Sequence, residues 1–154
     1  GVDVSKDILK MAVVERHKNT RHIGIGYLKG YGLKSGAVAT SVAHDSHNII
    51  CVGTSDEDMA FAVNRIAQNR GGIVVVKNGQ VLAELPLEIA GIISGKPLRE
   101  VNTLLEDAKK AAHALGVGTD IDPFMTLSFM SLPVIPTLRL TTRGVVDVNT
   151  QQYV

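Results

Sequence analysis

The sequence is poor in the residues that several common kinds of site require. It contains a single cysteine and no tryptophan among its 154 residues. One cysteine excludes an internal disulfide framework and any metal site that needs several cysteines. With only three Phe and three Tyr, a base-stacking platform for nucleic acid is not expected. Cys51 lies in the apolar run 48–52, which favours a buried small hydrophobe over a reactive thiol.

Net charge and long apolar runs are also nearly absent. The formal net charge is +1, from 16 basic and 15 acidic residues. This balance indicates neither a nucleic-acid-binding face nor an acidic tail. No stretch approaches the roughly 18 apolar residues of a membrane span, and no signal peptide is recognisable. We therefore expect no nucleic-acid partner, no membrane partner and a reducing cytoplasmic setting.

What is present is the composition of a globular domain. Hydrophobic residues make up 45% of the chain and are spread along its length, so a single compact core is expected. The first residue is Gly1 rather than Met. We expect this to mark either a piece of a longer chain or a residue left by cloning.

Strand-like and helix-like segments succeed one another along the chain. Strands are predicted at 8–15, 37–43, 48–53, 73–77, 80–84 and 145–148, and helices at 55–70 and 97–115. Residues 124–130 are read as a short buried helix, with a strand as the alternative. Asn78-Gly79 predicts a tight hairpin turn. Together these segments predict one α+β domain, with a mixed β-sheet of about five to seven strands packed against helices and not a TIM barrel. Strand order is left open.

The densest group of polar side chains lies between two predicted strands. It consists of His44, Asp45, Ser46, His47 and Asn48. A catalytic triad is not expected, because neighbours on an extended chain point to alternating sides and do not align nucleophile, base and orienting group. One interpretation is a turn with surface histidines, and another is a loop that faces a substrate or partner.

A metal site on this segment is a further interpretation. His44 and His47 are three apart, so their imidazoles share a face only on a helix or in a tight turn. A third ligand would have to come from Asp45, or from Glu15 or His17 at the end of the first predicted strand. At that strand end, solvation of charged side chains competes with a functional role. We assign no metal ligand to this chain.

Two other motifs have structural explanations. Gly24 and Gly26 lack the third glycine and the following helix of a dinucleotide-binding loop, so close backbone packing or a positive φ explains them better. The acidic run 56–58 follows Thr54 or Ser55, either of which can cap a helix. Acidic side chains in the first turn of a helix interact favourably with its dipole, which explains this run without a metal.

Several ordered motifs closely resemble the C-terminal domain of bacterial adenine deaminases. The most specific are 42–50, Val-Ala-His-Asp-Ser-His-Asn-Ile-Ile, and 53–59, Gly-Thr-Ser-Asp-Glu-Asp-Met. Shorter matches lie at 14–17, 29–34, 85–87, 90–91 and 122–129. The resemblance runs from about Ile8 to Val148. It departs at 18–22, Lys-Asn-Thr-Arg-His, where the family more often has a His-Gly-Thr-Gly-Asn-like loop.

The resemblance implies a part in the hydrolysis of adenine to hypoxanthine and ammonia, a purine-salvage reaction of the amidohydrolase superfamily. In this family manganese or iron activates water, and its ligands, a His-x-His pair among them, lie on a TIM barrel that precedes this domain. The chain has no His-x-His and, with one cysteine, no zinc-deaminase signature. We therefore expect residues 1–154 to be the C-terminal domain alone, without a cofactor and inactive in isolation.

The resemblance implies two partners, the barrel of the same polypeptide and adenine. An added domain can close an open barrel site and exclude water. On this hypothesis, residues 44–48 together with Glu15 and His17 face the barrel. One alternative is a structural or oligomerisation module, a homo-oligomer included, whose polar segments are only surface turns. Another is a free-standing binding protein, which the length of the native gene product would distinguish.

Overall fold

Six strands form the main sheet of the computed structural model, in the order β2-β1-β4-β3-β5-β6, and each pairing is antiparallel. They are β1 (Ile8–Val14), β2 (Ile23–Lys29), β3 (Ala37–Thr40), β4 (Ile49–Gly53), β5 (Gly72–Lys77) and β6 (Gln80–Pro86). Three short strands, β7 (Leu138–Thr141), β8 (Gly144–Asp147) and β9 (Gln152–Tyr153), form a second sheet. The structure describes residues 2–14, 23–41, 49–87, 97–130, 138–141, 144–147 and 152–153.

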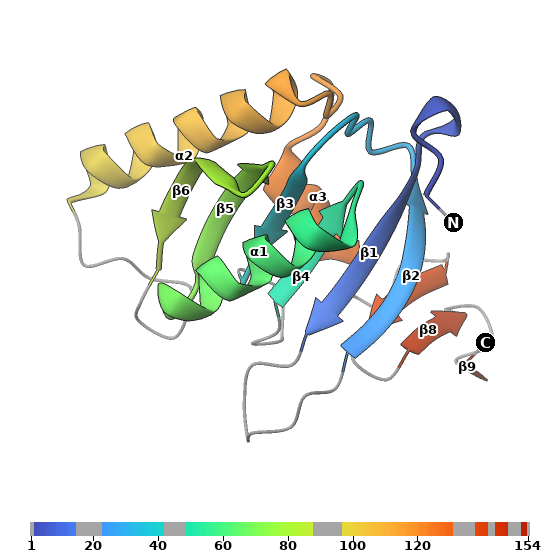
Figure 1. Ribbon diagram of the computed structural model, residues 1–154. Helices are drawn as coiled ribbons and strands as arrows, with labels where there is room; N and C mark the ends of the chain where they lie inside the picture. Colours follow the sequence, from blue (N-terminus) through green and yellow to red (C-terminus); the bar gives the residue numbers. More distant parts are fainter. Residues whose placement is uncertain are drawn as a thin grey trace.

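Helices cover both faces of the main sheet (Figure 1). Helix α1 (Asp56–Gln68) lies on one face, and α2 (Leu98–Ala114) and α3 (Pro123–Met130) lie on the other. A single 3-10 turn, η1 (Val4–Lys6), precedes β1. Because β4 and β5 both pair antiparallel to β3, they run parallel to each other, and α1 is the crossover between them. The crossover carries α1 over the centre of the sheet.

Side chains alternate between the two faces along each central strand, which produces two hydrophobic cores. In β4, Ile50 and Val52 join the large core beneath α2 and α3, whereas Ile49 and Cys51 join the smaller core beneath α1. Strand β1 shows the same alternation. The smaller core is lined on the sheet side by small residues, Ala12, Ala37, Ala39 and Cys51 among them, which lets α1 approach closely. The central strands are buried on both faces, which explains why their sequences are continuous apolar runs.

The ends of the helices follow the expected capping chemistry. Ser55 caps α1 by accepting a hydrogen bond from the Asp58 amide at 3.2 Å, and residues 56–58 form the first turn. The Asp122 carboxylate accepts hydrogen bonds from the Phe124 and Met125 amides, each at 3.0 Å, at the start of α3. Burial raises the pKa of Asp122, but the hydrogen bonds from these amides and the nearby Lys109 lower it by more. The pKa of Asp122 is therefore below its usual value. The interpretation of 56–58 as a helix start is confirmed.

The structure confirms the α+β class, an open sheet rather than a barrel, and the predicted helices at α1, α2 and α3. The Asn78-Gly79 hairpin between β5 and β6 is also confirmed, with positive φ at both residues. One feature of the prediction is corrected: the sheet is antiparallel, not mixed, because the helical crossover spans β3 instead of joining neighbouring strands. Among the described residues, no helix is long and apolar enough to cross a membrane.

Strand β2 was not predicted from the sequence, because glycine is uncommon in strand interiors. Gly24 and Gly26 are buried and lie opposite Val13 and Met11 of β1. The β7–β8 hairpin lies against β2. A glycine in a strand often marks the close approach of another backbone, and the hairpin supplies such a neighbour. Both glycines are therefore buried within a strand, and a close backbone approach at these two positions stays a prediction.

Candidate functional site

At one end of the main sheet, the last residue of β1 lies between the first residues of β2 and β4. Val14, the last residue of β1, pairs with Ile23 on one side and with Ile49 on the other. Strand β3 ends beside β4 at the same level, where Thr40 pairs with Ile50. We call this the candidate end of the sheet and define it by Val14, Ile23 and Ile49. Two chain segments that are far apart in sequence, 15–22 and 42–48, therefore join the sheet on adjacent strands.

The candidate residues belong to these two segments. Glu15 and His17 follow Val14 in sequence, and His44, Asp45, Ser46, His47 and Asn48 precede Ile49. All of them lie outside the described residues. Their described neighbours show that both segments begin or end at the candidate end.

Hydrogen bonds hold β3 and β5 together at this end. The Ser41 hydroxyl accepts a hydrogen bond from the Gly72 amide at 2.6 Å, and the Ser41 amide donates to the Gly72 carbonyl at 2.8 Å. Ser41 is fully buried. A satisfied buried hydroxyl of this kind orders the backbone around it. These two hydrogen bonds therefore fix the position of Ser41, the residue that directly follows β3.

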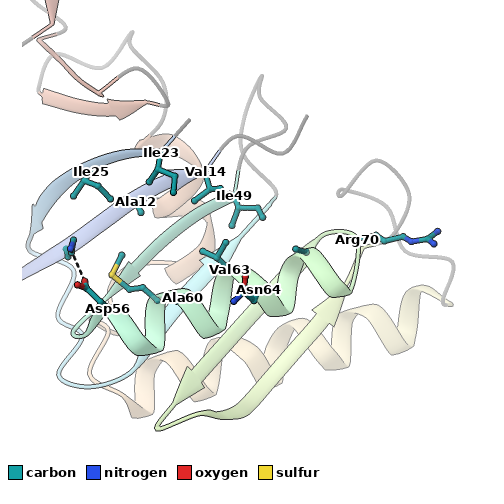
Figure 2. Close-up of a pocket in the computed structure, with 13 residues that line it drawn as sticks. Ala12, Val14, Ile23, Ile25, Ile49, Asp56, Ala60, Val63, Asn64 and Arg70 are labelled. Atoms are coloured by element: carbon teal, nitrogen blue, oxygen red, sulfur yellow. Dashed lines mark hydrogen bonds and ion pairs between the residues drawn. The ribbon is translucent and has the colours of Figure 1, made fainter. Parts of the chain in front are cut away.

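A groove opens beside the candidate end, between α1 and the face of β1, β2 and β4 (Figure 2). Its volume is about 920 Å³. The sheet wall is apolar and carries Ala12, Val14, Ile23, Ile25 and Ile49; α1 contributes Met59, Ala60, Val63 and Ala67, with the polar Asn64. We call it the α1 groove. Because Val14, Ile23 and Ile49 line it, the groove continues directly into the candidate end.

Charged side chains stand at the two ends of the α1 groove. Asp56, at the start of α1, forms an ion pair with Lys10 of β1, with 2.8 Å between Nζ and Oδ1. The hydrogen bond that the Lys10 ammonium donates to this carboxylate raises the pKa of Lys10. Arg70, just beyond the other end of α1, has a positive φ of 61° and points away from the groove interior in Figure 2. Apolar walls with charged ends suit an apolar occupant better than acid–base chemistry.

The groove wall formed by α1 is held in place by a clamp to β6. Arg65 donates two hydrogen bonds to the Glu84 carboxylate, at 2.8 Å from Nε and 2.7 Å from a terminal nitrogen. The Asn69 side chain donates a third, at 2.9 Å. A bidentate arginine–carboxylate pair is stronger and more directional than a single ion pair. The Arg65 hydrogen bonds hold the pKa of Glu84 below its usual range.

This clamp predicts a pH-dependent stability difference. Replacing Glu84 with Gln is expected to lower the free energy of unfolding at pH 7 by about 1 kcal/mol, since the pair is only partly buried. The pKa of Glu84 is depressed in the folded state. Its contribution is therefore complete above the ordinary carboxylate range and is lost as the pH falls through the folded-state pKa. Urea unfolding of both proteins at several pH values should show the two curves converging in acid; a constant offset would contradict the assignment.

Other reactive side chains of the described residues have structural roles. Cys51 is fully buried, and burial raises the pKa of its thiol, as the sequence suggested for a small hydrophobe. His113 lies in the last turn of α2, with its Nδ1 3.0 Å from the Val117 carbonyl oxygen. In the described ranges no group of three or more His, Cys, Asp or Glu could hold a metal ion. These residues therefore do not fit the metal that the family resemblance implies.

Sequence reasoning missed the α1 groove altogether. Its signal was present in 23–27, Ile-Gly-Ile-Gly-Tyr, where large apolar side chains alternate with glycine. That alternation predicts a strand with one bulky face and one flat face. Which partner each face would meet depends on β7–β8 and α1, both distant in sequence.

Similarity to known proteins covers nearly the whole chain. Residues 1–152 match the family described as adenine deaminase C-terminal domain. The chain is 51% identical over 152 residues to an adenine deaminase of Brucella anthropi and 47% identical over 152 residues to that of Bacillus subtilis. It is 53% identical over 145 residues to adenine deaminase 2 of Carboxydothermus hydrogenoformans.

These matches cover nearly all of this chain but only a small part of each relative. They include 99%, 99% and 94% of this chain, but only 27%, 26% and 25% of the three relatives. The chain thus spans about a quarter of the length of the curated relatives it matches.

Proposed function

Because this chain belongs to the adenine deaminase C-terminal domain family, we propose that it acts within a full-length hydrolase converting adenine and water to hypoxanthine and ammonia. In this proposal the candidate end of the sheet faces the active site of a preceding amidohydrolase barrel. Its role there is to cover the site and exclude water, so that reacting groups are not exposed to bulk solvent. Manganese or iron would belong to the barrel, which the relatives' additional length can accommodate.

One observation carries this proposal. Val14 pairs with both Ile23 and Ile49, so two polar segments join the sheet on neighbouring strands at a single end. Glu15 and His17 follow the first strand, and residues 44–48 precede the second. Their side-chain types can donate and accept hydrogen bonds with purine nitrogens or with a water molecule. In this proposal these segments complete the barrel site, and the alternative of a purely structural or oligomeric module assigns them no contact with adenine.

Substitution in the full-length enzyme tests the proposal. Replacing His44 or His47 with Ala is expected to lower kcat/KM for adenine by about tenfold to a hundredfold, the effect of losing one positioned hydrogen bond. Initial rates of ammonia release, measured over a range of adenine concentrations, separate kcat from KM.

His113→Ala is the matched control. His113 lies in the last turn of α2. Just beyond that turn, the Leu115 carbonyl accepts a hydrogen bond from the Lys34 amide at 2.8 Å. Lys34 belongs to the loop that enters β3 at Ala37, the end of β3 opposite to the candidate end. The control should retain kcat and KM, because its imidazole lies 3.0 Å from the Val117 carbonyl oxygen, away from the candidate end. If the His44 and His47 variants kept both constants as well, the structural alternative would be preferred.

A further inference from the structure

An apolar face of β2 is left uncovered in the described part of the chain. The side chains of Ile23, Ile25 and Tyr27 are 55%, 43% and 58% exposed. They alternate with the buried Gly24 and Gly26 on the opposite face. Large aliphatic side chains are seldom exposed side by side without a partner surface.

This exposed face continues into the α1 groove. Ile23 and Ile25 belong to both, and they lie beside Val14 and Ala12 of β1. Figure 2 shows these side chains on the sheet wall, with Val63 and Asn64 of α1 across from them. The Lys10–Asp56 ion pair and Arg70 stand at the rim. An apolar centre with a charged rim is the usual composition of a protein–protein interface core and its border.

We propose that the α1 groove and the exposed face of β2 form the surface on which this domain docks against the catalytic barrel of its own polypeptide. The inference rests on the proposed function, which supplies the barrel. It adds the particular face, the strands involved and the apolar character of the contact. On the barrel side it requires a complementary apolar surface next to the C-terminal face, where the active sites of TIM barrels lie.

Two observations select the barrel as the occupant. Roughly three quarters of each relative's length lies outside the matched region, so in those relatives a large partner is part of the same polypeptide. Tethering gives that partner an effective concentration in the millimolar range, well above that of a second copy in dilute solution. The groove also shares Val14, Ile23 and Ile49 with the candidate end. A single body that covers the candidate end therefore covers the groove without a break.

Cysteine labelling in the full-length enzyme tests the inference with a matched pair. Ile25→Cys places a thiol on β2, and Leu82→Cys places one on β6, the opposite edge of the sheet. The native side chains are 43% and 46% exposed in this domain, so free surfaces would react at similar rates. Cys51 is fully buried and does not compete within the domain. We expect maleimide labelling at position 25, resolved by peptide mass spectrometry, to be at least about tenfold slower, because it requires opening of the interface.

A crosslinking arm identifies the occupant. Ile25 is replaced with p-benzoylphenylalanine in a mixture of isotope-labelled and unlabelled enzyme, and Leu82 receives the same substitution as a control. Crosslinks from position 25 to peptides that precede this domain in the same molecule would support the inference. Crosslinks to a second copy, crosslinks confined to residues 1–154, or equal labelling at positions 25 and 82 would each overturn it.

The two proposals fail separately. Labelling and crosslinking report contact and do not depend on turnover, whereas the His44 and His47 variants report on turnover. Protection at position 25 with unchanged kinetics of the histidine variants would leave the docking surface in place and remove the active-site role. Impaired histidine variants without protection at position 25 would leave the active-site role and show that the barrel docks elsewhere.

Discussion

Incubated with adenine and manganese, the isolated 154-residue chain is expected to release ammonia no faster than a blank without protein. Deamination requires an activated water, which the family resemblance assigns to metal ligands on the barrel. This chain contains no His-x-His pair, and its described residues gather no set of three potential ligands. The loss relative to the full-length enzyme should be at least about 10⁶-fold, the lower end of ordinary enzymatic accelerations.

The measurement needs a control for metal loading. The isolated domain and the full-length enzyme are stripped with a chelator, reloaded with manganese or iron and assayed side by side for ammonia. Recovery of activity in the full-length enzyme alone is the expected result. Metal-dependent ammonia release by the domain alone would show a self-contained site, with the segments 15–22 and 42–48 as the first place to seek its ligands.

Gly72→Ala is expected to lower the free energy of unfolding by about 3–4 kcal/mol, because a positive-φ backbone outside the ordinary left-handed well and a steric clash act together. Gly72 has a φ of +128°, and a Cβ there would lie 2.1 Å from the Leu85 carbonyl oxygen. That oxygen belongs to the neighbouring strand β6, so relief requires β5 and β6 to separate. The Gly72 amide also donates to Ser41, which links the change to the candidate end.

Gly79→Ala separates the two causes. Gly79 has a φ of +73°, close to the left-handed helical region, and a Cβ there meets no atom within 4 Å. Only the backbone preference is lost, so a cost of about 1 kcal/mol is expected. Thermal unfolding of both variants measures the difference; for a domain of this size the Gly72 variant should melt roughly 10 °C lower than the wild type. Equal destabilisation of the two would show that the clash with Leu85 is relieved by local movement.

Local chemistry made much of the fold predictable. Ser55 caps α1 and Asp122 caps α3, and both helices begin where these side chains satisfy free amides. The Asn78-Gly79 turn selects a hairpin because both residues accept a positive φ. The continuous apolar run at Ile49–Gly53 predicts a strand buried on both faces, and β4 lies at the centre of the sheet. Each of these signals depends on neighbours within a few residues.

Contacts between distant segments decided what the sequence left open. Strand β2 contains two glycines with weak strand propensity, and it forms because β1 pairs along its whole length and β7–β8 lies against it. The strand order places β4 beside β1 although 34 residues separate Val14 from Ile49 in the numbering. Such a pairing forms only after the loop between the two strands has closed, and closing it costs conformational entropy. No local sequence pattern therefore specifies the pairing.

The sequence alone determined the class of the fold, its helices, its central strands and the family to which its motifs belong, because these follow from local propensity and from ordered motifs. Tertiary structure alone decided that Val14, which precedes Glu15, pairs with Ile49, which follows residues 44–48, at one end of a sheet, and that α1 and β2 enclose an apolar groove beside it. The physical reason is that a surface is made by side chains from several strands, and strand order is set by the total burial of the folded chain rather than by any one segment.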